Sequence, residues 1–505
     1  METQDVRKHP ISGWFYIDMR LALNANDDRE DAIRFLPPDR ILRNFRGEVA
    51  EDYSAPEQEY AAHLFPLTNV FDADDWSMGF QEYWDYDRDK IRFWNSFRTE
   101  VIRRFETYQL PVIELGRDTP RQAVCQVFEK VNTGGVTLTV FELLTATYAA
   151  EEFDLRRHWE GQCRAAWSAP EYRILQEVSN TDFLQAVTLL ATSARRDAAA
   201  ARGEEDERLP RIGCKRADML GLTLAEYQRF APVIITGMRA AAKFLHRQHL
   251  FDTKFLPYGT QLIPLAAILA VLNKEGEIAG AQERLARWYW CGVFGELYGG
   301  TTETRFSRDL PEVISWIRGS GIHPRTVTEA QFVPGRLLTL RTRGSAAYKG
   351  VYALLMKEGA LDWRTGEAAT VTLYFDEAID IHHIFPKIWC ERRNIKPQRY
   401  NSIVNKTPLT ARTNRVIGGR APSEYLARLA SSAGVDADTI GKHVSTHLVR
   451  TDLMQLDDFD DFFTARARAL LDKISVAMGK RIDDVEPTEE EELDTLDPED
   501  DTDDL

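Results

Sequence analysis

The chain has 505 residues, 44% hydrophobic and 10% aromatic, so it can bury large cores and is expected to divide into about three domains. Its five cysteines include no Cys-x-x-Cys pair, which argues against a zinc ribbon or a disulfide framework. The longest apolar run, residues 262–272, is shorter than the roughly 20 residues that span a bilayer, and the N-terminus has no secretory signal pattern. We expect a cytoplasmic protein without a membrane partner.

The formal net charge of -16 is concentrated at the C-terminus, where residues 483–505 contain 14 acids and no Lys or Arg. Removing these acids from the total leaves -2 for the rest of the chain. Residues 380–430, by contrast, contain ten Lys and Arg against three Asp and Glu, a surplus of +7. The charge therefore permits contact with a polyanion in the basic segment.

In chain order, residues 1–150 mix short β-type runs with helical stretches and predict an α+β unit. Residues 151–345 carry apolar side chains at helical spacing, which predicts a helical domain with a charged loop at 195–208. Residues 346–430 are predicted to form a separate domain that contains the candidate site. It begins with a helix at 346–357, which is followed by a β-type run at 371–375. Residues 431–480 are predicted to end in an amphipathic helix, and the acidic tail 481–505 is predicted to be disordered. The predicted class is α+β, predominantly helical.

The candidate site begins at two adjacent histidines, His382 and His383, directly after β-type residues. A second short run at 403–409 is predicted to pair with the first as a hairpin, and a helix is predicted to begin at 412 and to end at Gly418-Gly419. This arrangement can bring His383, Asn405 and Asn414 within a small radius.

These residue types can form a metal-assisted phosphodiesterase. A neutral His383 would take a proton from water, while His382 and Asn414 hold a divalent cation against the phosphate. Asn405 would either orient His383 or brace the hairpin. In the alternative, the histidines end a strand and pack into a core, and both asparagines are turn residues.

Basic side chains surround this segment and are candidates for contact with DNA phosphates. Each of them could instead simply be solvated. The candidates are Lys387, Arg392, Arg393, Arg412, Arg415 and Arg420.

Two motifs carry a resemblance to a known family. The run from His382 to Pro386, then Asn405, then Thr413-Asn414-Arg415 ahead of residues 421–426, resembles the C-terminal nuclease domain of GmrSD-like restriction enzymes, a branch of the HNH (His-Me finger) endonucleases. Residues 127–138, Val-Phe-Glu-Lys-Val-Asn-Thr-Gly-Gly-Val-Thr-Leu, resemble the companion motif of the family's ParB-like N-terminal domain.

The resemblance implies a small ββα-metal (HNH) nuclease domain and cleavage of modified or phage DNA in bacterial defence, with Mg²⁺ or Mn²⁺ as cofactor. By position, His383 matches the general base, His382 and Asn414 the metal ligands, and Asn405 the middle asparagine. Many relatives have Asp where His382 stands, so a weaker hold on Mg²⁺ or greater tolerance of Mn²⁺ is expected. Asp380 lies on the same strand face and could restore the charge.

The N-terminal motif has two interpretations. Phe128, Asn132, Gly134 and Gly135 would line part of a nucleotide or DNA-sensing pocket, or the Asn-Thr-Gly-Gly segment is an ordinary turn. Relatives carry Asp-Gly-Gln-Gln-Arg ahead of this region, and this chain has no Asp-Gly pair. We therefore expect a nucleoside triphosphate only if a preceding segment or a partner polypeptide supplies that sequence. The alternative to an endonuclease is a non-catalytic DNA-binding or regulatory subunit of a split restriction complex.

Overall fold

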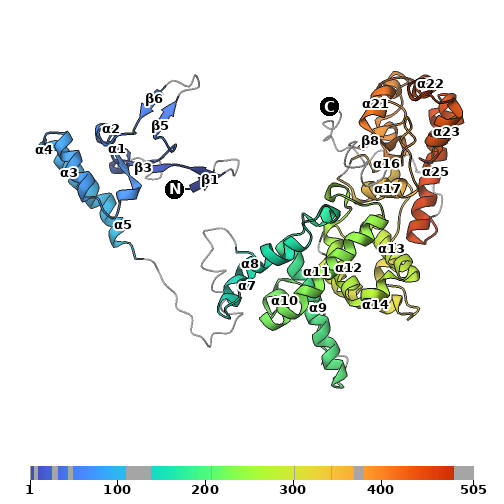
Figure 1. Cartoon of the computed structure of the whole chain (residues 1–505), viewed down its shortest axis with the longest axis horizontal. Helices are drawn as coiled ribbons and strands as arrows, with labels where there is room; N and C mark the ends of the chain where they lie inside the picture. Colours follow the sequence, from blue (N-terminus) through green and yellow to red (C-terminus); the bar gives the residue numbers. More distant parts are fainter. Residues whose placement is uncertain are drawn as a thin grey trace. The chain divides into compact units, whose positions relative to one another are not determined.

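The structure, a computed structural model, describes most of the chain. The described residues are 2–4, 10–24, 32–43, 49–109, 138–205, 208–300, 302–342, 344–368 and 380–482. They are mostly helical, and their strands form only two- and three-stranded sheets, which confirms the predominantly helical α+β class. The chain divides into two compact units, residues 1–116 and 117–505 (Figure 1). No helix within the described ranges is both long and apolar enough to cross a membrane.

The N-terminal unit is a small α+β structure. Its strands β4, β3 and β7 form an antiparallel sheet in that order. Aromatic side chains of the sheet and the helices form its core, in which Phe65 packs against Trp76 and Trp94 at ring distances of 5.0 and 5.9 Å. The main elements are β1 (Glu2–Gln4), β2 (Pro10–Ser12), β3 (Trp14–Asp18), α1 (Met19–Leu23), β4 (Ile33–Leu36), β5 (Ile41–Arg43), β6 (Val49–Asp52), α2 (Pro56–Ala62), β7 (Leu64–Pro66), α3 (Asp74–Tyr83), α4 (Arg88–Phe97) and α5 (Arg103–Thr107).

A buried histidine in this unit makes its stability depend on pH. His63 lies between two cations, with Arg20 Nη2 2.7 Å from Nδ1 and Lys90 Nζ 2.9 Å from Nε2. Burial, and then the charges of Arg20 and Lys90, lower the pKa of His63 from 6.5 to about 4. The unfolded chain therefore binds a proton near pH 6.5 that the folded unit does not accept until about pH 4.

We expect the N-terminal unit to lose stability as the pH falls from 6.5 toward 4, because His63 must stay neutral in the fold. The substitution His63→Asn should flatten this dependence, since Asn tolerates the left-handed backbone at this position (φ 60°) and does not titrate. Hydrogen-exchange protection of α3 and α4, corrected for the intrinsic exchange rate, measures the effect at each pH. An equally steep decline in the variant would exclude His63 as the cause.

The second unit begins with a helical body around one continuous hydrophobic core that extends from Val140 to Met478. The apolar helix α12 lies at its centre and packs against α9, α11 and α14. The body's main helices are α7 (Val140–Ala149), α8 (Leu155–His158), α9 (Asn180–Ala201), α10 (Arg216–Leu220), α11 (Leu224–Arg247), α12 (Leu262–Leu272), α13 (Ala279–Phe294), α14 (Glu303–Ile317), α15 (Arg325–Glu329) and α16 (Arg336–Thr339).

The rest of the second unit carries the candidate site. Its long final helix packs against α13 and α17, and its core is continuous with that of the helical body. α7, which the sequence placed in the N-terminal region, packs against α9 and α10. The elements are α17 (Ala346–Lys357), β8 (Asp380–His383), α19 (Lys387–Arg392), α20 (Pro397–Tyr400), β9 (Lys406–Leu409), α21 (Ala411–Ile417), α22 (Pro422–Ala433), α23 (Ala437–Ser445), α24 (Thr451–Gln455) and α25 (Phe459–Met478).

The charged stretch 195–208 is not wholly the loop that the sequence predicted, because α9 continues to Ala201. Residues 198–201 are four consecutive alanines, which have the highest helix propensity of any residue. Arg195 further secures the helix through a 2.6 Å ion-paired hydrogen bond to Glu226 of α11. Helix propensity and this pairing outweigh the high polarity on which the loop prediction rested.

Candidate functional site

The predicted hairpin and helix are present at the histidines. β8 and β9 pair antiparallel, with His382 opposite Thr407 and His383 opposite Lys406. His382 lies within β8, while His383 is its last residue, where the strand passes into the turn. Helix α21 follows β9 directly and ends at Gly418, whose φ of 54° lies in the left-handed region. Residues 403–405, predicted as strand, form a 3-10 turn instead.

Hydrogen bonds from Asn405 and Tyr425 fix the backbone of the turn that follows the histidines. Phe385 N–H donates to Asn405 Oδ1 at 2.8 Å, and Asn405 Nδ2 donates to the carbonyls of Phe385 and Tyr400, both at 2.9 Å. Ile384 N–H donates to the Asn405 carbonyl at 2.8 Å, and the Tyr425 hydroxyl donates to Ile384 O at 2.7 Å. Asn405 has no exposed surface. Of the two roles predicted for it, orienting His383 or bracing the hairpin, these contacts fit the brace.

His383 is oriented by a different asparagine, Asn401, which follows helix α20. Asn401 Oδ1 lies 3.1 Å from His383 Nε2. An amide oxygen accepts hydrogen bonds, so this contact fits an imidazole that carries a proton on Nε2. Both side chains are partly exposed. His383 is thus a half-buried imidazole whose Nε2 is oriented by a neighbouring amide.

A buried carboxylate anchors helix α21 to the chain ahead of the hairpin. Asp362 accepts hydrogen bonds from Thr413 Oγ1 at 2.7 Å, from Thr410 Oγ1 at 2.8 Å and from Thr410 N–H at 3.1 Å. Burial alone would raise the pKa of Asp362, but the hydrogen bonds from Thr413 and Thr410 outweigh burial and lower it. The carboxylate therefore stays charged at the N-terminus of α21, where the helix dipole favours an anion.

A fully buried histidine supports strand β9. His447 Nε2 donates to Leu361 O at 2.7 Å, and the Thr407 hydroxyl lies 2.6 Å from Nδ1. Burial lowers the pKa of His447 to about 3, so it stays neutral. His447 is consequently a packed core residue that positions the strand opposite His382.

Two of the three predicted metal ligands have described side chains. His382 is partly buried on β8, and Asn414 is partly buried in the middle of α21. No hydrogen bond joins the Asn414 side-chain amide to another described residue, so its oxygen is available to a ligand. Asp380 lies two positions before His382 in β8, and its side chain is outside what the structure describes.

The donor chemistry fits a divalent cation that takes only part of its coordination from protein. Across the described ranges, no cluster of three or more His, Cys, Asp or Glu side chains could hold a metal ion. Mg²⁺ at phosphoryl-transfer sites commonly keeps several waters and takes one or two protein ligands together with substrate phosphate. An amide oxygen from Asn414 and an imidazole from His382 are compatible with such an open site, and the imidazole favours a softer ion such as Mn²⁺.

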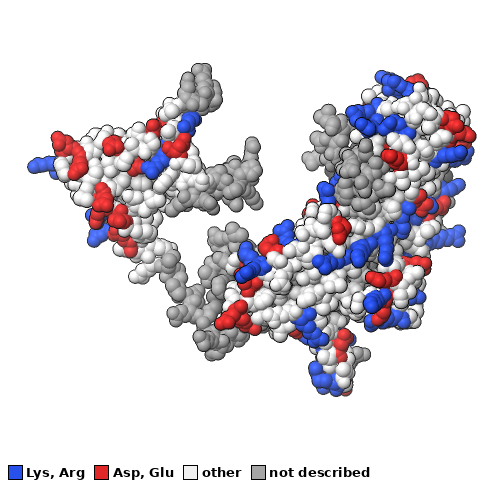
Figure 2. Space-filling view, viewed as in Figure 1, with Lys and Arg blue, Asp and Glu red and all other residues white. Residues whose placement is uncertain are grey.

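The predicted phosphate contacts come from two segments that touch. A Cβ on Gly419, after α21, would lie 3.6 Å from Ile388 Cδ1 in α19, so the two segments are in van der Waals reach. The Arg393 guanidinium carbon lies over Trp389, 4.2 Å from the ring centre. Figure 2 shows Lys and Arg side chains over the end of the unit that holds α21. Of the six candidates Lys387 is partly buried, and the exposed ones are Arg392, Arg393, Arg412, Arg415 and Arg420.

The predicted nucleotide or DNA-sensing pocket lies outside the described residues. Phe128, Asn132, Gly134 and Gly135 all fall between residues 110 and 137, as does the turn that was its alternative. The β-type run 371–375 and the acidic tail from residue 483 onward are likewise outside them.

Several residues that hold the candidate site were not singled out from the sequence. Asn401 and Tyr425 act through partners 18 and 41 residues away, which no local pattern announces. Asp362 had a local signal, since Asp362-Trp363-Arg364-Thr365-Gly366 is a turn sequence with an Asx bond and a glycine at φ 69°. That signal identifies the turn but not the helix that the carboxylate caps.

Comparison with known proteins identifies a relative but no activity. No protein-family model matches the chain. The chain is similar to the uncharacterized protein MJ0686 of Methanocaldococcus jannaschii, which is 24% identical over 504 residues, covering 91% of this chain and 79% of that protein.

Proposed function

We propose that the protein is a metal-dependent DNA endonuclease or nickase of a bacterial anti-phage or modification-dependent restriction system, similar to the GmrSD-like enzymes. The proposal depends on one observation above all. His383 is partly exposed, and its Nε2 lies 3.1 Å from Asn401 Oδ1, on a turn whose backbone groups are held by Asn405 and Tyr425. An imidazole held in one tautomer on a rigid turn is the arrangement that a general base needs.

In the proposed reaction, Nδ1 of His383 takes a proton from a water molecule, whose oxygen attacks the phosphorus atom. The bond from phosphorus to the 3′ oxygen breaks, and that oxygen takes a proton from solvent. A divalent cation held by His382 and Asn414, with Asp380 as a further candidate, would supply charge neutralisation at the phosphate and the leaving oxygen. The exposed arginines of α19 and α21 would bind neighbouring phosphates and position the duplex.

The finer assignments belong to the same proposal. Residues 346–430 would form the ββα-metal nuclease domain, and residues 1–150 a partial ParB-like domain that senses nucleotide or modified DNA. A nucleoside triphosphate would bind only if a preceding segment or a partner polypeptide contributes the Asp-Gly-Gln-Gln-Arg sequence. Modified or phage DNA would be the substrate, and the cytoplasm the compartment.

The test is cleavage of supercoiled plasmid, unmodified and carrying cytosine modifications, by the purified full-length protein. We expect open-circular product with Mn²⁺ or Mg²⁺, more with Mn²⁺ because an imidazole replaces the usual carboxylate, and none with excess EDTA. Binding that weakens steeply with salt, with no cleavage in any metal on any of these plasmids, would reject the endonuclease and favour a DNA-binding subunit.

A further inference from the structure

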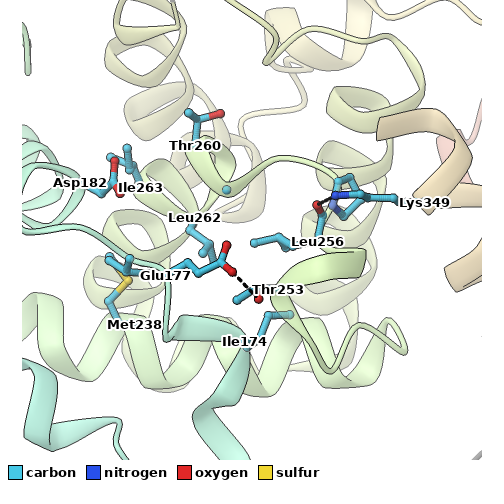
Figure 3. Close-up of a pocket in the computed structure, with 13 residues that line it drawn as sticks. Ile174, Glu177, Asp182, Met238, Thr253, Leu256, Thr260, Leu262, Ile263 and Lys349 are labelled. Carbon is cyan, nitrogen blue, oxygen red and sulfur yellow. Dashed lines mark hydrogen bonds between the residues drawn. The ribbon is translucent and has the colours of Figure 1, made fainter. Parts of the chain in front are cut away.

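A cavity of about 370 Å³ lies in the helical body of the second unit, within residues 174–349. Its walls come from the start of α9, from α11, α12 and α17, and from the loop 253–260 (Figure 3). Ligand sites are usually concave, about 300–1,000 Å³ in volume and mostly apolar, with a few polar groups that set specificity. This cavity has that size, and nothing in the proposed nuclease function uses it.

Buried apolar side chains form much of its wall. They include Met238 of α11, Ile263 of α12 and Ile174, whose exposed fractions are 0, 1 and 0%. Such a wall stabilises an apolar ligand group by removing it from water.

A lysine contributes a positive charge that lacks an ion-pair partner. Lys349 Nζ donates one hydrogen bond, to the carbonyl of Leu256 at 3.1 Å, and an ammonium has three N–H groups. No described carboxylate lies within ion-pair distance of it. Burial lowers the pKa of Lys349, while the charge of Glu177 raises it, so the two groups interact without touching. An anionic ligand group would satisfy the remaining donors.

Two carboxylates supply the opposite charge. Glu177 accepts from Thr253 Oγ1 at 3.0 Å, and Asp182 accepts from Ser179 N–H and Oγ at 2.9 and 2.7 Å. Neither forms an ion pair with a described residue. In Figure 3, Asp182 lies on the side of the cavity away from Lys349, and the Glu177 carboxylate lies between them beside Thr253.

We propose that this cavity binds a small zwitterion, an amino acid or short peptide with an apolar side chain. Its ammonium would lie against Glu177 and Asp182, its carboxylate against Lys349, and its side chain against Met238 and Ile263. Opposite charges that face the same cavity but do not pair with each other fit a ligand that carries both complementary charges. A simple cation would leave Lys349 without a partner, and a simple anion would leave both carboxylates without one.

Isothermal titration of the full-length protein with L-leucine and L-leucyl-L-leucine tests the proposal. At least one should bind with a Kd below about 1 mM. The singly charged analogues 4-methylpentanoate and 3-methylbutylamine should bind at least about tenfold more weakly, because each lacks one complementary charge. The proposal is wrong if neither zwitterion binds up to about 10 mM, or if either analogue binds as tightly as the better zwitterion.

Two variants assign the binding to this cavity. Lys349→Met and Glu177→Gln should each weaken zwitterion binding by about tenfold or more. The matched control is Lys357→Met on the same helix. Lys357 lies outside the cavity, where its Nζ donates to Gln248 Oε1 at 2.8 Å, so this variant should bind the zwitterion as tightly as the wild type. Glu177 is exposed, so its substitution leaves the fold intact even if Lys349→Met lowers the melting temperature. Unchanged binding by Glu177→Gln would place the ligand elsewhere.

Discussion

Replacing His383 with alanine is expected to slow plasmid nicking by about 10²–10⁴-fold, the usual contribution of a general base. The fold should persist, because the turn after β8 is held through Asn405 and Tyr425 and not through the His383 ring. Nicking rates at saturating Mn²⁺, with a thermal melt of each protein, measure the two effects separately.

His323→Ala is the matched control for this substitution. His323 is exposed between α14 and α15 in the same unit, with its ring centre 5.3 Å from that of Trp316. The His323→Ala variant should nick plasmid at the wild-type rate. Added imidazole should partly restore nicking to His383→Ala, since it can replace the missing base in the space that alanine leaves. Equal nicking by His383→Ala and wild type would remove His383 from the mechanism.

The second large effect is expected for Asn405→Ala, which should lower the free energy of unfolding of the second unit by about 3–5 kcal/mol. The substitution leaves Phe385 N–H and the carbonyls of Phe385 and Tyr400 buried without their side-chain partner. An unpaired buried polar group costs about 1–3 kcal/mol. Urea unfolding followed by tryptophan fluorescence measures the shift in midpoint.

Asn401→Ala provides the contrast. Asn401 is partly exposed and its side chain has one described contact, to His383, so stability should change by less than about 1 kcal/mol. Nicking, however, should fall about tenfold to a hundredfold, as for other residues that orient a reacting imidazole. If Asn405→Ala instead lost activity at wild-type stability, Asn405 would be a catalytic group and its role as a brace would be refuted.

Local features of this site follow from local sequence. Helix 346–357 and the helix that ends ahead of Gly418 are predicted from the sequence, because helix formation depends mainly on neighbours three and four positions away. The hairpin follows from two short apolar runs. The loop predicted at 195–208 was wrong over residues 195–201, because polarity was weighed above the helix propensity of four alanines.

The different roles of Asn401 and Asn405 could not be predicted in the same way. The sequence analysis proposed Asn405, through its place in the motif, either to orient His383 or to brace the hairpin, and it did not consider Asn401. Burial decides between them: Asn405 is fully enclosed and bonded to backbone, while Asn401 reaches the imidazole at 3.1 Å. Which of two similar side chains is enclosed depends on packing from α22 and α25, which lie at least 17 residues further along.

The sequence by itself therefore determined the helical class, the hairpin with its following helix, the basic surroundings and the pair of histidines, because each depends on residues close together in the chain. Only the tertiary structure decided which groups orient and brace those histidines, how Asp362 binds the N-cap residue Thr410 of α21 from 48 residues away, and that Lys349 and Glu177 face one cavity. Hydrogen bonds and charges act over a few ångströms in space. Their partners are set by the path of the whole chain, which local propensity does not specify.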